Sequence, residues 1–385
     1  PFAVQTTSDN SPGSVLQSIG GGGGIVANVG GDVSLGGTQS INITASGGSL
    51  TYSQNDLSIS TQGDDSPGTV LQSIGGGGGL VGAVEGSVDV GSASALGTDV
   101  SGSDISAESD APISTSGVSS PGFTIQSIGG GGGLVGSAPT SVAFESSGFG
   151  NSSSGAINFT NTGGITTSGL NSSGVILQSI GGGGVYTTSS GGAVIRLGGS
   201  VVGNNDSASI TFNNEAPITT SGSNSSAVVV QSIAGGGGAV FGLEDASVTT
   251  LTLGANNAAE NQANNLNISI NGDLTTGAGA EEPGNNSPAL IAQSIGGGGG
   301  YAPLASTNAS LGSRASENLD AGGITLNIDA DVRTSGFASD GLLVQSIGAG
   351  GGIAGSTTSS LTMGATDLAN GDAANITINN TGTIT

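Results

Sequence analysis

Short runs of alternating apolar and polar residues recur along this chain with a period near 53 residues. In one copy, Ile157-Asn-Phe-Thr160 alternates with period two, which is typical of a half-buried β-strand. Two further apolar runs follow, Ile165-Thr-Thr167 and Val175-Ile-Leu-Gln-Ser-Ile180. The intervening Asn-Thr-Gly and Thr-Ser-Gly segments supply residues that accept left-handed turn conformations. The pattern therefore predicts three short strands joined by tight turns.

The third predicted strand ends in Gln-Ser-Ile, and this motif returns seven times, followed by a run of glycines. Successive glutamines are separated by 55, 54, 52, 53, 62 and 52 residues. Six copies carry an apolar residue 13 positions before the glutamine, whereas Leu274 lies 19 before Gln293. We therefore expect a six-residue loop insertion between Gly277 and Pro288. A fixed period of this length indicates one structural unit copied along a repeat array.

These features predict an all-β protein, a parallel β-helix (β-solenoid) of seven repeats that forms one continuous domain over residues 1–385. Helix is not expected, because Gly, Ser, Thr, Asn and Val dominate and no 3.6-residue periodicity is sustained. The repeat cores are expected at 4–25, 59–80, 105–134, 157–185, 210–239, 266–300 and 324–352, with a partial repeat at 376–385.

The size of one coil stays open at this point. The patterned part, about 22 residues, has the length of one β-helix coil, so the motif would mark where that coil closes. The rest of each repeat holds another short strand, such as Ser87-Val-Asp-Val90, and a variable polar stretch. It is either a second, irregular coil or an outward arm. Two coils per repeat predict a rod of about 65–70 Å, and one large coil predicts about half that length.

The recurring glutamine shares a strand face with apolar residues, so its amide needs hydrogen-bond partners. Stacked amides can bond one another in a ladder; with two coils per repeat they would be about 10 Å apart and need backbone partners instead. A ligand-binding role is the less favoured alternative. The candidate ladder residues are Gln17, Gln72, Gln126, Gln178, Gln231, Gln293 and Gln345.

The glycine run does not have the form of a nucleotide-binding loop. A phosphate-binding loop needs a lysine, which the chain lacks, and a dinucleotide fingerprint needs a following helix. Glycines instead permit very close approach of neighbouring backbone. We expect the run to pack against the equivalent run of the next repeat.

Charge and composition narrow the possible functions. The chain has 27 acidic and three basic residues and a net charge of −24, so we expect neither nucleic acid nor anionic membrane as a partner. It lacks His, Cys and Lys, so we assign no catalytic, cofactor-binding or metal residues and do not expect an enzyme. Asp64-Asp65 and Glu281-Glu282 are more typical of solvated turns, although such turns could bind calcium.

The repeated Ile-Thr-Thr-Ser-Gly-x-x-Ser-x-Gly-Val-x-x-Gln-Ser-Ile-Gly-rich pattern resembles the repeats of autotransporter-type passenger regions and large filamentous adhesins of Gram-negative bacteria. The resemblance covers the patterned half of all seven repeats. It implies a right-handed parallel β-helix displayed outside the cell or attached to the outer membrane. The chain opens at Pro1 and stops at Thr385 partway through a repeat, so we expect a segment of a longer protein.

The resemblance leads us to expect a structural filament or stalk that associates end to end or continues as a longer array. An adhesin whose variable inter-repeat arms bind glycans or another cell surface is the alternative. No run of about 18 apolar residues is present, so we expect no membrane insertion within this segment.

Overall fold

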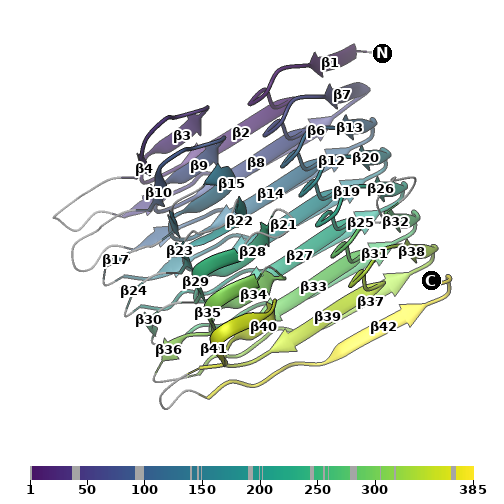
Figure 1. The fold of residues 1–385 in the computed structure, drawn as a ribbon. Helices are drawn as coiled ribbons and strands as arrows, with labels where there is room; N and C mark the ends of the chain where they lie inside the picture. Colours follow the sequence, from purple (N-terminus) through teal and green to yellow (C-terminus); the bar gives the residue numbers. More distant parts are fainter. Residues whose placement is uncertain are drawn as a thin grey trace.

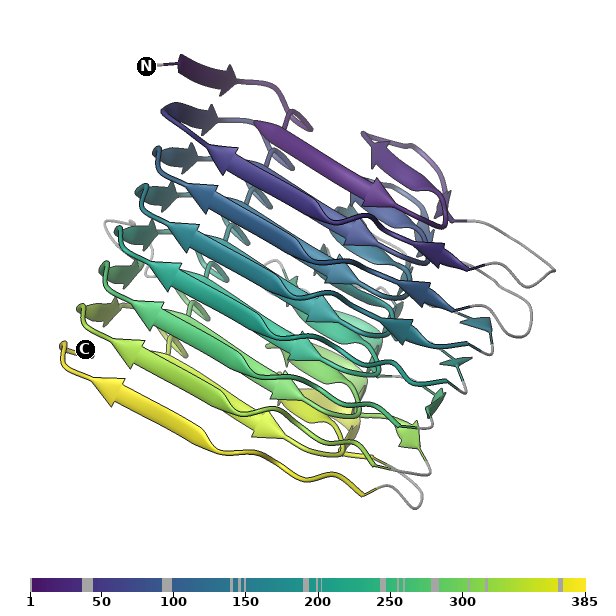
Figure 2. The same ribbon diagram turned by 180° about the vertical axis from the view of Figure 1, so that it is seen from behind.

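The computed structural model is a stack of seven coils, with the two termini at opposite ends of the stack (Figures 1 and 2). It describes the chain except residues 1, 37–43, 92–98, 139–140, 145–146, 149, 190–193, 199, 202, 243–246, 255, 259, 278–283, 304, 316–317 and 366–369. The described residues contain strands and turns and no helix. The all-β, parallel solenoid expected from the sequence is confirmed.

Each coil contributes one strand to each of five parallel seven-stranded sheets, here called the first to fifth walls in the order in which the chain meets them. The first wall is β1 Phe2–Thr6, β7 Leu57–Thr61, β13 Ile113–Thr115, β20 Ile165–Thr167, β26 Ile218–Thr220, β32 Leu274–Thr276 and β38 Val332–Thr334. The second wall, which carries the Gln-Ser-Ile motif, is β2 Ser14–Ile19, β8 Thr69–Ile74, β14 Phe123–Ile128, β21 Val175–Ile180, β27 Val228–Ile233, β33 Leu290–Ile295 and β39 Leu342–Ile347.

The glycine run leads into the third wall, formed by β3 Gly23–Val26, β9 Gly78–Val81, β15 Gly132–Ala138, β22 Gly184–Ser189, β28 Gly237–Gly242, β34 Gly299–Ala302 and β40 Gly351–Ala354. The fourth wall is β4 Val33–Leu35, β10 Ser87–Val90, β16 Ser141–Phe144, β23 Val194–Leu197, β29 Ser247–Leu253, β35 Ala305–Leu311 and β41 Thr357–Met363.

The fifth wall returns the chain to the start of the next coil through β6 Leu50–Gln54, β12 Ile105–Ser109, β19 Ile157–Asn161, β25 Ile210–Asn214, β31 Leu266–Ile270, β37 Ile324–Ile328 and β42 Ile376–Asn380. Short strands lie between the fourth and fifth walls: β5 Ala45–Ser46, β11 Val100–Ser101 and β18 Ser152–Ser153 in one sheet, β17 Ser147–Gly148 with β24 Ser200–Val201, and β30 Asn256–Ala258 with β36 Arg314–Ala315.

Strand pairing answers the question of coil size. Gln126 pairs in register with Gln72 on one side and Gln178 on the other, so equivalent residues of successive repeats are direct neighbours. One repeat is therefore one large coil, and seven coils give a stack on the order of 30–35 Å. The interpretation that a 22-residue coil closes at Gln-Ser-Ile is wrong. Its three strands are the fifth, first and second walls, and the supposed arm adds the third and fourth walls before the coil closes.

The coil is large because its core has two compartments. The fifth, first and second walls enclose one core, in which the ring of Phe159 stacks on Phe212 with centroids 5.5 Å apart. The third and fourth walls enclose the other, which includes Val90 and Phe144. Between the second and third walls, residues such as Ile176 and Phe241 pack together. The second wall is thus buried on both faces, which explains its near-continuous apolar sequence.

Close backbone contact explains the glycines at the start of the third wall. Gly79 has φ of 142°, and a Cβ atom there would overlap the carbonyl oxygen of Gly24 in the preceding coil. Gly78 has φ of 154°, and a Cβ atom there would overlap the carbonyl oxygen of Gly132 in the following coil. The runs therefore pack directly on one another, as expected from the sequence.

The contact between glycine runs can be tested with a matched pair of variants. Gly24→Ala and Gly79→Ala place a side chain on backbone of nearly the same conformation, with φ of 146° and 142°. A Cβ atom on Gly24 meets nothing within 4 Å, whereas one on Gly79 overlaps a carbonyl. We expect Gly79→Ala to lower the free energy of unfolding by about 1–3 kcal/mol more than Gly24→Ala. Equal losses in denaturant titrations would contradict the packing argument.

Candidate functional site

The recurring glutamines form one continuous row of amides inside the stack. The side-chain Nε2 of each glutamine donates to the Oε1 of the glutamine in the following coil, at 2.7–2.8 Å, across all six junctions. The row contains Gln17, Gln72, Gln126, Gln178, Gln231, Gln293 and Gln345. The five inner members are fully buried. The row therefore has the geometry of a ladder within the protein rather than of an exposed binding site.

The second amide hydrogen ties the second wall to the third. Gln126 Nε2 also donates to the carbonyl of Gly133, at 2.9 Å, and Gln72 makes the same bond to Gly79 at 3.2 Å. Gln17, Gln231 and Gln293 repeat it with the glycine seven residues later. Each of these amides thus bonds both along the stack and across it. Since a buried polar group without a partner is costly, this bonding stabilises the interior.

The serine of the motif points to the other side of the wall and connects it to the segment that leads into the fifth wall. Ser127 Oγ accepts the Gly155 N–H at 2.8 Å and donates to the Ser103 carbonyl at 3.0 Å. The equivalent serine accepts a backbone N–H in all seven coils. The isoleucine packs on its own copies, as Ile180, Ile233 and Ile295 show. All three residues of the motif therefore join coils to one another.

Sequence reasoning missed a second polar row, at the corner between the first and second walls. Thr115 Oγ1 donates to the Ser120 carbonyl at 2.6 Å, and the Ser66 N–H donates to Ser120 Oγ at 2.9 Å. The serine bond recurs at six junctions between Ser11 and Ser339. A threonine five residues before a serine, repeated with the array's own period, is a signal that could have found it.

Carboxylates and amides at the turns also join coils. Asp104 Oδ1 accepts the Ala156 N–H at 2.8 Å, and Asp320 Oδ1 accepts the Asp372 N–H at 2.9 Å, each from the next coil. Asn151 does the same for the Asn204 N–H at 3.0 Å. Some of the aspartates that give the chain its negative charge thus accept hydrogen bonds from the backbone of the next coil.

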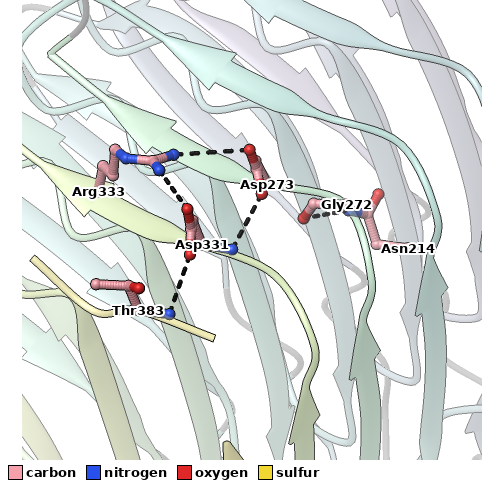
Figure 3. A network of polar contacts seen from close by, with 6 residues as sticks. All are labelled: Asn214, Gly272, Asp273, Asp331, Arg333 and Thr383. Carbon is pink, nitrogen blue, oxygen red and sulfur yellow. Dashed lines mark hydrogen bonds and ion pairs between the residues drawn. The ribbon is translucent and has the colours of Figure 1, made fainter. Parts of the chain in front are cut away.

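The turn between the fifth and first walls shows this arrangement with a counter-ion (Figure 3). Asp273 Oδ1 accepts the Asp331 N–H at 3.0 Å, and Asp331 Oδ1 accepts the Thr383 N–H at 3.1 Å. Arg333 forms ion pairs with both carboxylates, at 3.6 Å to Asp273. The Thr383 N–H, with a smaller contribution from Arg333, holds the pKa of Asp331 below its usual value. The cluster is exposed and its groups are paired with one another. Its bonds link the turns of neighbouring coils, so a structural role fits it best.

The acidic pairs singled out in the sequence do not gather into a recognisable metal centre. Asp64 and Asp65 lie in the turn between β7 and β8, and Glu281-Glu282 lies outside the described residues. Across the described part of the chain, no three Asp, Glu, His or Cys side chains are placed to hold one ion. Calcium binding therefore stays an untested prediction.

Comparisons with known proteins give no family, since no family model, curated protein or solved structure matches the chain. The parallel β-solenoid architecture rests on the strand pairing described above. Within the described residues, no helix is long and apolar enough to cross a membrane.

The amide row can be tested at its centre with Gln178→Leu. Gln178 accepts from Gln126 and donates to Gln231, both at 2.8 Å, so the change removes both bonds in a fully buried place. We expect the free energy of unfolding to fall by about 1–3 kcal/mol. The control is Gln62→Leu, because Gln62 is exposed after β7 and its loss should change little. Equal melting temperatures for Gln178→Leu and the parent chain would contradict a structural role for the row.

Proposed function

We propose that this chain is a structural segment of an extracellular filament or stalk, displayed at a bacterial surface as part of a longer secreted protein. The observation that carries the proposal is that all three side chains of the repeated motif are occupied in contacts within or between coils. Gln126 bonds to Gln178 and Gly133, Ser127 bonds to backbone, and the isoleucines stack. We infer that the motif is repeated because its side chains hold the coils together, and not because they bind a ligand.

The sequence resemblance to autotransporter-type passengers and filamentous adhesins supports display outside the cell. Composition supports it too, because a net charge of −24 keeps a long β-rich fibre soluble and discourages lateral clumping. In the described part of the chain, each coil pairs only with the coils on either side of it. We therefore propose that stacking continues, either in a longer array or end to end with another copy. No enzymatic activity is proposed.

A glycan-binding adhesin is the second candidate, and the outer face of the fifth wall favours it. The outward positions there are nearly all hydroxyls and amides, the groups that bond sugar hydroxyls. They are Thr51, Ser53, Ser106, Glu108, Asn158, Thr160, Thr211, Asn213, Asn267, Ser269, Thr325, Asn327, Thr377 and Asn379. Parts of the variable arms named in the sequence analysis lie outside the described residues, so their role stays a prediction.

Electron microscopy and glycan binding separate the two candidates. A scaffold should form regular fibres in negative stain and show no saturable binding on a glycan array. Saturable binding that is lost when exposed Asn158 and Asn267 are replaced by Asp, while the melting temperature is kept, would favour the adhesin. Particles with no fibrous form and no glycan binding would contradict both.

A structural fibre should also resist proteolysis, and this chain offers a sharp test with trypsin. Its three basic residues lie in paired strands: Arg196 in β23, Arg314 in β36 and Arg333 in β38. β23 is paired with a strand on each side, whereas β36 and β38 are each paired with one named strand. A protease needs the strand to detach from these neighbours before it can cut. We expect the native chain to remain intact under conditions that cut the heat-denatured chain at all three sites. Rapid native cleavage at Arg196, which lies mid-stack, would contradict the prediction.

A further inference from the structure

A row of left-handed residues runs along the corner between the first and second walls. One residue per coil has φ between 51° and 54° there: Asn10, Asp65, Ser119, Asn171, Asn224, Asn286 and Ala338. Asparagine fills four of the seven places, as expected for a conformation that Asn tolerates better than most residues. Only Asp65 brings an ionisable group into the row.

In the first two coils, the side chain at this position lies against the third-wall segment of the next coil. Asn10 Oδ1 occupies the space where Gly82 would carry a Cβ atom, and Asp65 Oδ1 occupies the corresponding space at Gly136. Only a residue without a side chain fits beneath them. In these two coils, the corner is therefore closed by a polar group that contacts glycine backbone.

The two neighbouring coils treat this polar group differently. In the first coil, Asn10 Oδ1 has no hydrogen-bond partner among the residues that the structure describes, but the neutral amide carries a second polar atom, Nδ2, which donates to Asn28 Oδ1 at 2.7 Å. The register of β3 with β9 and the Val29–Val84 bridge place Ala83 at the position equivalent to Asn28, so the second coil has a methyl group there in place of an amide. Among the described residues, Asp65 Oδ1 is buried and has no hydrogen-bond partner.

Like charges surround this carboxyl. Asp64 belongs to the same turn, and Asp9 belongs to the turn of the preceding coil, where it accepts the Asp64 N–H. On the opposing side, Gly132–Ala138 brings no ionisable residue to the contact. Burial, followed by repulsion from Asp64 and Asp9, raises the pKa of Asp65 to about 7.

We propose that the corner at Asp65 is a proton-controlled joint between the second and third coils. With the carboxyl protonated, the turn Gly63–Pro67 stays closed on Gly136. When the proton leaves, a charge without a partner lies against glycine backbone, and the turn and the adjoining end of β15 open towards water. The other six coils lack this response because their left-handed residues do not ionise.

The sign follows from the two ionisation states. The raised pKa of Asp65 means that the folded corner binds the proton more tightly than the open chain, whose aspartate has its usual pKa near 4. Lowering the pH from about 7 towards 4 therefore stabilises the closed corner, and above pH 7 the destabilisation is complete. Asp331, whose pKa is lowered, acts in the opposite direction and only in more acidic solution.

The experiment is hydrogen exchange with mass spectrometry on the full chain at pH 5 and pH 8, corrected for intrinsic exchange rates. For peptides covering 62–70 and 132–138, we expect local opening to be more than about tenfold greater at pH 8 than at pH 5. Asp65→Asn should remove the difference, since Asn stands in this conformation in four other coils. Asp65→Ser, which reproduces the residue found at Ser119 in the next coil, is the second variant should the first fold poorly.

Asp89→Asn is the matched control, because it removes one charge from an exposed position on the fourth wall. It should leave the difference between the two pH values unchanged. An equal difference in Asp65→Asn and the parent chain would overturn the proposal, as would its loss in Asp89→Asn, which would indicate a general charge effect. Neither result bears on the proposed filament role, which fibre formation tests separately.

Discussion

The structure depends on register: the buried glutamines of the amide row and the serines of the corner between the first and second walls find their partners in their own copies one coil away. Gln126 bonds to Gln72 and Gln178, and the Ser66 N–H bonds to Ser120 Oγ, because equivalent residues are direct neighbours in parallel sheets. A slip by one residue would turn each of these side chains to the opposite face of its strand. An interior with so many amides and hydroxyls can therefore be buried only because the same residue types recur at the same positions of successive coils.

Two unusual features of composition follow from the same condition. Glycine is abundant because the chain crosses from the second wall to the third where backbone of successive coils is in direct contact, as at Gly78 and Gly132. Aspartate outnumbers the bases because short carboxylates at turns accept N–H groups from the next coil, as Asp104 does. Both residues serve the junction between coils, which explains why charge accumulates without matching lysines.

The sequence was sufficient for the strands and for the repeat, because alternation at Ile157–Asn161 and the fixed spacing of the glutamines are local signals. It was not sufficient for the coil, because a 22-residue coil and three walls of a larger one have the same local pattern. Two features of the larger coil left no periodic signal in the sequence. Strands such as β21 are buried on both faces, and the glycine run has no side chains that could alternate. The corner around Asp65 was equally hidden, since its strain depends on Gly136 and Ala83, which are distant in the sequence.

The sixth repeat has one more consequence. The additional residues expected there fall between β32 and β33, and 278–283 lie outside the described part of the chain. Both strands keep their pairing with the coils on either side, and Thr276 still bonds to the Ser287 carbonyl. The corner therefore accepts extra chain while the strand register is kept, because the bond that defines the corner joins residues on either side of the insertion. A peptide or small domain could therefore be inserted at this position of the chain. The solenoid would keep the register of its strands.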